Sequence, residues 1–201
     1  SDTGDDLPRH PASATQSDAV MTAFGKKFCV ISGGPGTGKT FTVSEILKLF
    51  ETVANIRIAL AAPTGKAAAR LQEAVGTTPL LRGAAVCTLH RLLGTIPGSP
   101  YFRFNAARPL PYDLVIVDEA SMIDLALMSK LTQAMLPDSR LILLGDKDQL
   151  ASVEAGAVLG DICDTGGISG RNNHPMYSCI VHLEKNYRFG HDSGIRAISR
   201  T

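Results

Sequence analysis

The chain has 201 residues, which is long enough for one sizeable hydrophobic core, or for one domain and part of another. Its hydrophobic content of 44% and charged content of 19% are typical of a globular protein. No apolar run approaches the roughly 18 residues that span a membrane. The formal net charge of +1 argues against a globally basic nucleic-acid binder, although a local groove can still be basic.

The four cysteines are far apart in the sequence and form no Cys-x-x-Cys pair. This spacing suggests neither a zinc ribbon nor a redox motif. With no visible signal peptide, it favours a reducing, cytoplasmic setting. Residues 1–14 contain hardly any large apolar residue, so we expect them to be a mobile N-terminal segment outside the fold.

Short apolar runs rich in Val, Ile or Leu recur after this segment, and each is too short for a helix. They predict buried strands at residues 28–32, 57–62, 114–118, 141–145 and 180–183. Apolar residues at helical spacing predict helices between these strands, over residues 43–50, 68–75 and 125–135. The alternation predicts an α/β fold in which helices flank a mostly parallel sheet. Ligands bind such sheets at the carboxyl ends of the strands.

Residues 33–40, Gly-Gly-Pro-Gly-Thr-Gly-Lys-Thr, lie between the first predicted strand and the first predicted helix. This context favours a P-loop over a simple glycine-rich turn, because glycines let backbone N–H groups surround phosphate oxygens at a helix N-terminus. We expect Lys39 to reach the β- and γ-phosphates of ATP and the Thr40 hydroxyl to ligate Mg²⁺. The predicted ATP-binding residues of this stretch are Gly34, Pro35, Gly36, Thr37, Gly38, Lys39 and Thr40.

Two adjacent carboxylates, Asp118 and Glu119, follow a predicted buried strand. Adjacent residues at a strand end point in different directions. We therefore expect Asp118 to hold Mg²⁺ and Glu119 to orient or deprotonate the attacking water. The alternative is that the pair caps a helix beginning near Ser121. Gln149 follows another predicted strand and is a candidate sensor of the γ-phosphate, the alternative being a polar turn.

Two segments do not fit the alternation of strands and helices. Residues 95–112 are predicted to form an excursion such as a hairpin, and residues 164–178 a polar loop, both outside the core. The aromatic and basic residues at 101–104 suit base stacking, while a locally packed hairpin is the stronger alternative.

Four longer stretches, at residues 61–71, 88–94, 117–124 and 144–163, are more specific than the P-loop. Together with it they resemble the motifs of the superfamily 1 DNA helicases. This resemblance implies a RecA-like P-loop NTPase fold. It also implies that residues 15–184 are a first, ATP-binding motor domain and residues 185–201 the truncated start of a second.

By the same resemblance, Gln16 matches the glutamine that reads the adenine edge, and Arg188 the arginine that stabilises charge on the γ-phosphoryl group. Two further motifs match those that line a single-strand DNA path. Hydroxyl groups, backbone N–H groups and lysine suit sequence-independent phosphate contacts. The predicted DNA-binding residues are Pro63, Thr64, Lys66, Thr88 and His90. For His90, a hydrogen-bonded histidine at a helix start is the alternative.

The resemblance implies an ATP hydrolase and DNA helicase that moves 5′-to-3′ on single-stranded DNA. It further implies partner subunits in a helicase–nuclease complex that processes duplex ends for recombinational repair, with ATP and Mg²⁺ as cofactors and no membrane. The alternatives are a stand-alone helicase of the same branch and a nucleotide-switched assembly module. A GTPase is disfavoured because the chain lacks the guanine-reading Asn-Lys-x-Asp motif. The sequence also offers no separate carboxylate cluster for nuclease chemistry.

Overall fold

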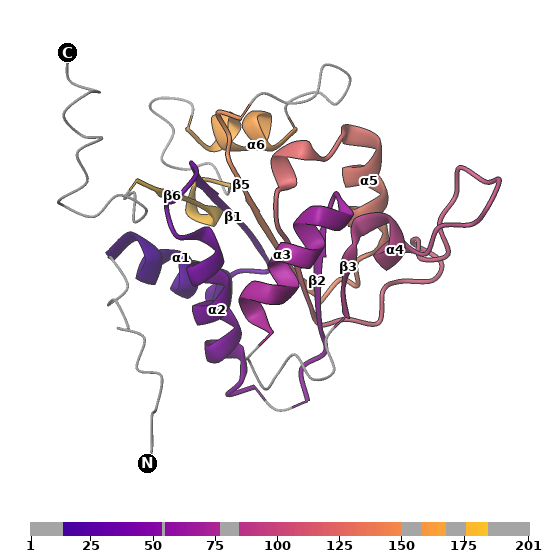
Figure 1. Ribbon diagram of the computed structural model, residues 1–201, viewed down its shortest axis with the longest axis horizontal. Helices are drawn as coiled ribbons and strands as arrows, with labels where there is room; N and C mark the ends of the chain where they lie inside the picture. Colours follow the sequence, from indigo (N-terminus) through magenta and orange to yellow (C-terminus); the bar gives the residue numbers. More distant parts are fainter. Residues whose placement is uncertain (1–13, 54, 77–84, 150–157, 168–175, 185–201) are drawn as a thin grey trace.

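The computed structural model describes residues 14–53, 55–76, 85–149, 158–167 and 176–184. They build one parallel sheet whose strands lie in the order β3-β2-β4-β5-β1-β6, which confirms the predicted fold class (Figure 1). The strands are β1 (Phe28–Gly33), β2 (Ile58–Ala62), β3 (Ala85–Thr88), β4 (Leu114–Val117), β5 (Arg140–Gly145) and β6 (Ile180–Leu183).

Helices cover both faces of the sheet. One face packs against α1 (Ala14–Gly25), α2 (Lys39–Phe50) and α3 (Gly65–Val75). The other packs against α4 (Leu89–Leu93), α5 (Leu125–Ala134) and α6 (Val158–Gly167). Two short 3-10 turns, η2 (Ala120–Met122) and η3 (Tyr177–Cys179), complete the described elements. Within the described ranges, no helix combines the length and apolar character that crossing a membrane requires.

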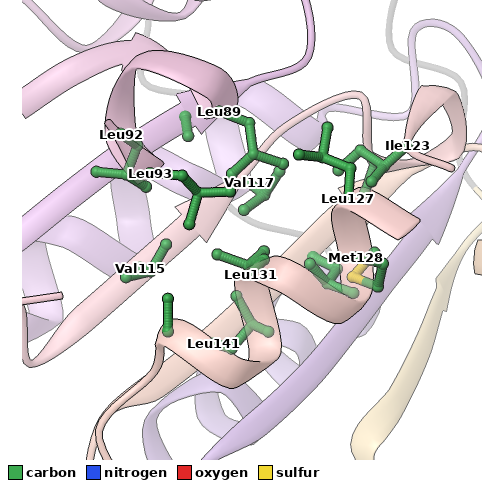
Figure 2. Packing of buried hydrophobic residues seen from close by; sticks show 14 of the residues in the cluster. Leu89, Leu92, Leu93, Val115, Val117, Ile123, Leu127, Met128, Leu131 and Leu141 are labelled. Carbon is green, nitrogen blue, oxygen red and sulfur yellow. The ribbon is translucent and has the colours of Figure 1, made fainter. Parts of the chain in front are cut away.

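The central strands supply both halves of the core because successive side chains of a strand point to opposite faces. Val115 and Val117 of β4 pack among α4 and α5, whose leucines surround them in Figure 2. Leu114 and Ile116 of the same strand belong to the cluster that includes α2. Every residue of β4 is buried, as expected for a strand covered on both sides.

Besides the helices α4 and α6, one strand and one further helix were missing from the sequence predictions. The strand β3 is short and only half-buried, so its run of Ala, Val, Cys and Thr gives a weak apolar signal. The helix α1 begins at Ala14, the last residue of the segment expected to be mobile, and the rest of that segment lies outside the described residues. Few large apolar residues mark α1 because it buries alanines, Ala19 and Ala23, against the sheet.

The prediction that residues 95–112 lie outside the core is wrong. Leu110 is 1% exposed within the core cluster, and its N–H donates to the carbonyl of Ala134 at 2.8 Å. Phe102 and Phe104 pack against the same cluster, and an antiparallel bridge joins Thr95 to Phe102. The locally packed hairpin is therefore the better description, because these aromatic rings have core neighbours to cover them.

The predicted loop at 164–178 also differs from the structure at both ends. The helix α6 continues to residue 167, and η3 begins at Tyr177. Glycines at 166 and 167 made the end of α6 look like loop in the sequence, whereas Leu159 and Cys163 anchor the helix to the core. Residues 168–175 lie outside the described part of the chain.

An ion pair joins β2 to β4 at the amino-terminal edge of the sheet. Arg57 binds both carboxylate oxygens of Asp113, with Nε–Oδ2 at 3.0 Å and Nη2–Oδ1 at 2.9 Å. The backbone N–H of Arg57 also donates to Oδ2 at 2.9 Å. These hydrogen bonds, the Arg57 side chain first, lower the pKa of Asp113.

We predict a pH-dependent loss of stability in Asp113→Asn. A lowered pKa in the folded state stabilises the fold above the ordinary aspartate pKa of about 3.9, and this contribution disappears as pH falls through the lower folded value. The variant should therefore melt below the parent at pH 7, and the difference in Tm should shrink toward zero in more acidic buffer. A difference in Tm that stays constant with pH, or that persists in an Arg57→Met background, would contradict this role.

Candidate functional site

A cavity of about 450 Å³ opens where β1, β4 and β5 end, which is a volume typical of small-ligand sites. Three connections meet there, because the carboxyl ends of parallel strands lie along one edge of the sheet. The lining residues are Gly34, Pro35, Gly36, Gly38, Lys39, Thr40, Arg70, Asp118, Glu119, Asp146 and Gln149.

The P-loop holds its shape through hydrogen bonds to its own carbonyls. The carbonyl of Gly34 accepts from the Thr37 hydroxyl at 2.9 Å and from Lys39 Nζ at 3.1 Å. Lys39 Nζ also donates to the carbonyl of Gly33. The ammonium group therefore lies across the loop and faces the cavity that the loop encloses.

Two glycines of this loop are required by geometry. A Cβ atom on Gly33 would stand 2.5 Å from the Thr37 hydroxyl, so the turn has no room for a side chain there. Gly38 has φ 87°, a left-handed conformation that side chains disfavour, and it caps α2 without a side-chain hydrogen bond. The first N–H groups of α2 consequently lie at the cavity, where a helix N-terminus attracts anions.

Asp118 is half-buried at the end of β4, and its backbone N–H donates to the carbonyl of Ala61 at 2.9 Å. Burial raises the pKa of Asp118, and the neighbouring charge of Glu119 adds to this effect. A hydrogen bond from the Glu119 N–H and the charge of Lys39 act in the opposite direction. A half-buried carboxylate of this kind is stabilised by a cation placed beside it.

Glu119 has an uncommon backbone conformation for a residue with a side chain. Its φ of 53° and ψ of 38° are left-handed helical, and its carbonyl accepts from the N–H of Met122 at 3.0 Å. Such a conformation costs about 1–2 kcal/mol in residues other than glycine. With this backbone conformation, the Glu119 side chain lines the cavity beside Asp118.

Side-chain hydrogen bonds connect the segment after β5 to its neighbours. Ser121 Oγ donates to Gln149 Oε1 at 2.8 Å, which joins η2 to the segment that follows β5. The N–H of Lys147 donates to Ser32 Oγ of β1 at 3.2 Å. These bonds fix the position of Gln149 relative to Glu119 and the P-loop.

Most predicted nucleotide-site residues come together at this cavity, with three exceptions. Gln16 of α1 is 3% exposed and donates to the carbonyl of Thr37 at 3.4 Å, so it adjoins the P-loop without lining the cavity. Thr37 belongs to the P-loop, but its side chain is buried and does not line the cavity. Arg188 lies outside the described residues.

The predicted DNA-binding residues lie apart from the cavity, at the starts of α3 and α4. Thr64 caps α3 by accepting from the N–H of Ala67 at 3.2 Å, and Thr88 caps α4 by accepting from the N–H of Arg91 at 3.3 Å. The two starts are neighbours because Ala62 of β2 pairs with Thr88 of β3. Pro63, between β2 and the Thr64 cap, is half-buried.

The side chains of Lys66 and His90 are exposed on this edge. The His90 ring packs 5.9 Å from that of Phe102, so the hairpin reaches the start of α4. Tyr101 of the same hairpin is 67% exposed, with Lys130 Nζ 5.6 Å from its ring centroid.

Two lining residues were not predicted. Asp146 directly follows β5, a position at which polar residues of parallel sheets commonly serve ligands, so its place was open to prediction. Arg70 lies on the exposed side of α3, and only the fold reveals that this side meets the cavity. The helical spacing of α3 predicts which residues are exposed but not which loop they face.

The donor set suits a magnesium ion that keeps much of its coordination for water and ligand. Among the described residues, no group of three or more His, Cys, Asp or Glu is arranged to hold a metal. Thr40 and Asp118 nevertheless supply one hydroxyl and one carboxylate to the same cavity. Mg²⁺ in phosphate-binding sites commonly takes only one or two protein ligands of this kind.

A P-loop at the first strand of this sheet, opposed by two carboxylates at the end of β4, defines a P-loop NTPase with a RecA-like fold. A family model described as an AAA domain matches residues 16–155, and the chain belongs to this family.

Curated relatives extend the similarity over most of the chain. The chain is 45% identical over 198 residues to the RecBCD enzyme subunit RecD of Mycolicibacterium smegmatis, with 90% of this chain and 34% of that protein covered. It is 44% identical over 151 residues to the ATP-dependent RecD2 DNA helicase of Deinococcus radiodurans, with 75% of this chain and 20% of that protein covered. The chain thus spans about a third or less of the length of these relatives.

Solved structures share the fold at lower identity. A Pif1 helicase from Bacteroides in complex with ADP-AlF3 and single-stranded DNA has a TM-score of 0.57 and 21% identity, with 95% of this chain and 46% of that chain covered. A Pif1 helicase from Candida albicans has a TM-score of 0.57 and 20% identity, with 88% of this chain and 40% of that chain covered.

We predict that glycine is more stabilising than alanine at position 119. Both substitutions remove the carboxylate, but only Glu119→Gly relieves the left-handed strain, so it should be the more stable variant by about 1 kcal/mol in denaturant unfolding. The matched pair at Glu73 in α3 should give the reverse order, because alanine is the better helix former by about 1 kcal/mol. The same order at both positions would contradict the strain at Glu119.

Proposed function

We propose that this chain contains the first motor domain of an ATP-dependent DNA helicase of the RecD type. The observation that carries the proposal is the convergence of Lys39, Asp118, Glu119 and Gln149 on one cavity. In this proposal residues 15–184 form the first RecA-like domain, residues 185–201 begin a second one, and residues 1–14 precede the fold.

ATP is the proposed ligand of the cavity. The N–H groups at the start of α2 and the glycines of the P-loop suit the binding of phosphates, with Lys39 at the β- and γ-phosphates. Gln16, beside the loop and hydrogen-bonded to Thr37, is the proposed reader of the adenine edge.

Thr40 and Asp118 are the proposed ligands of Mg²⁺, and their hydroxyl and carboxylate fit that role. When bound, the ion supplies positive charge that neutralises phosphate oxygens during transfer of the γ-phosphoryl group. Burial raises the pKa of Asp118, and the charge of Lys39 opposes this rise. A bound cation would favour the ionised carboxylate in the same way.

Glu119 is the proposed group that orients the attacking water and accepts its proton. Its strained backbone presents the carboxylate to the cavity beside Asp118, so the two carboxylates serve different tasks. Gln149, fixed by Ser121, places a neutral amide that senses the γ-phosphate without competing for that proton. Arg188 is the proposed arginine contributed by the second motor domain.

Single-stranded DNA is the proposed second ligand. Thr64 and Thr88 begin adjacent helices, and the exposed Lys66 and His90 supply positive and polar groups at the same edge. This set suits contacts to phosphates and not to bases, so we propose binding without sequence preference. The proposed 5′-to-3′ direction of movement rests on the resemblance to the superfamily 1 helicases alone.

The relatives named as subunits of a RecBCD enzyme support a role in such an assembly. We propose that the partners are RecB- and RecC-like subunits of exodeoxyribonuclease V, acting on duplex ends during double-strand break repair in the cytoplasm. A stand-alone helicase is the alternative, and the similarity to the ATP-dependent RecD2 DNA helicase of Deinococcus radiodurans is compatible with it. The position of Glu119 disfavours an assembly module that merely binds nucleotide, because such a module needs no general base.

We predict that Glu119→Gln separates nucleotide binding from hydrolysis. In the full-length protein, single-stranded DNA should stimulate ATP hydrolysis, and the variant should lower kcat by about a hundredfold or more because the amide keeps the shape of the residue but loses the base. Affinity for ATP should survive in Glu119→Gln.

Lys39→Ala is the control variant for this experiment, because it should lose nucleotide affinity instead. If Glu119→Gln fails to hydrolyse ATP only because it fails to bind it, the role proposed for Glu119 is wrong. If single-stranded DNA leaves the parent rate unchanged both with and without partner subunits, the motor function is contradicted. Partner subunits that are needed for this stimulation would favour the complex over the stand-alone helicase.

We predict that Lys66→Ala weakens single-strand DNA binding by a similar factor for all sequences. The loss of one phosphate contact should reduce the slope of log K against log salt by about 0.7, measured by titration with oligonucleotides of different composition. Lys26→Ala, at the opposite edge of the sheet before β1, should leave the slope unchanged. A sequence-selective loss, or an unaltered slope in Lys66→Ala, would remove Lys66 from the DNA path.

A further inference from the structure

We propose that Arg70 binds the terminal phosphate of the nucleotide and makes the site selective for a triphosphate over a diphosphate. This inference rests on the proposed function and adds a residue that belongs to neither the P-loop nor the paired carboxylates. Arg70 comes from α3, the helix after β2, and lines the cavity together with Lys39 and Glu119.

The direction of the Arg70 side chain follows from the helix. α3 buries Ala68, Leu71 and Val75, so its opposite side is exposed, and Arg70 lies on the part of that side next to the cavity. Glu73 is one turn further along the same helix, at the spacing of an intrahelical ion pair. Within the described residues, however, Arg70 makes no ion pair with it, and its guanidinium donors are available to a ligand.

The balance of charge in the cavity also favours this role. Lys39 and Arg70 are the two cationic side chains among the lining residues, which also include Asp118, Glu119 and Asp146. Lys39 Nζ is hydrogen-bonded to the carbonyls of Gly33 and Gly34, at the P-loop end of the cavity. A triphosphate brings more negative charge into this cavity than Lys39 alone can balance, and a guanidinium is suited to binding two phosphate oxygens at once.

The order of the strands places Arg70 at the end of the cavity where the γ-phosphate would lie. Gln16 belongs to α1, which packs beside β1 and β6 at one end of the sheet. The cavity then crosses the ends of β1, β5 and β4, and α3 follows β2, the next strand in that direction. A nucleotide with its base near Gln16 and its phosphates on the P-loop therefore extends its terminal phosphate toward Glu119 and Arg70.

Binding of two nucleotides to the 201-residue chain tests this assignment. The probes are Mg-ADP and the magnesium complex of a non-hydrolysable ATP analogue, titrated into the parent, Arg70→Ala and Arg70→Lys. Arg70→Ala should weaken binding of the triphosphate about tenfold to a hundredfold, the range for a hydrogen bond to a charged group, and leave ADP affinity unchanged. Arg70→Lys keeps the charge without the planar fork and should fall between the parent and Arg70→Ala.

The controls distinguish a failure of the role of Arg70 from a failure of the proposed nucleotide site. Alanine is a strong helix former, so Arg70→Ala should retain the helical circular dichroism of the parent, and Gln72→Ala, exposed on the same helix, should bind both nucleotides as the parent does. Equal losses for ADP and the triphosphate analogue in Arg70→Ala, or no loss for either, would overturn the role of Arg70 alone. A parent chain that binds neither nucleotide would overturn the nucleotide site as well.

Discussion

The structure depends on a sheet whose strands are parallel and buried on both faces. Burial on both faces requires helices as crossovers, and helical crossovers return every strand to the same direction. As a consequence, the P-loop, the carboxylate pair and the loop ending at Gln149 all emerge at one edge. The leucines of α4 and α5 pack with the valines of β4 on one face of the sheet and so fix the strands that end at this edge (Figure 2). The hydrophobic core and the functional site are therefore products of one topology.

Within this frame, the site combines residues held by ordinary geometry with one residue held under strain. The P-loop adopts its shape through hydrogen bonds to its own carbonyls and through glycines that fit it without steric strain. Glu119 instead takes a left-handed backbone, which the buried residues around η2, Ala120 and Ser121, keep in place. Strain of this kind persists only where the surrounding packing over-determines it, and it is common at sites of chemistry.

The sequence predicted the parts of the molecule whose signal is local. Five of the six strands have clear apolar runs, the P-loop and the Asp118–Glu119 pair each follow such a run directly, and Gln149 comes shortly after another. The parts that escaped prediction depend on contacts between distant residues. Leu110 is in the core because the hairpin folds back onto α5, and Arg70 meets the cavity because α3 follows β2, the strand next to β4. The residues next to Leu110 and Arg70 in the sequence therefore do not predict these contacts.

The helix α3 carries residues of both proposed binding sites, the one for single-stranded DNA and the one for the nucleotide. Thr64 and Lys66 lie at its start, and Arg70 follows Lys66 by one turn, a distance of about 6 Å along the axis. A helix is a rigid element, so on the proposed assignments a movement of its first turn on binding single-stranded DNA also moves Arg70 relative to the cavity. On the proposed assignments, α3 couples the DNA contact at Lys66 to the nucleotide contact at Arg70, so a change in one contact also changes the other.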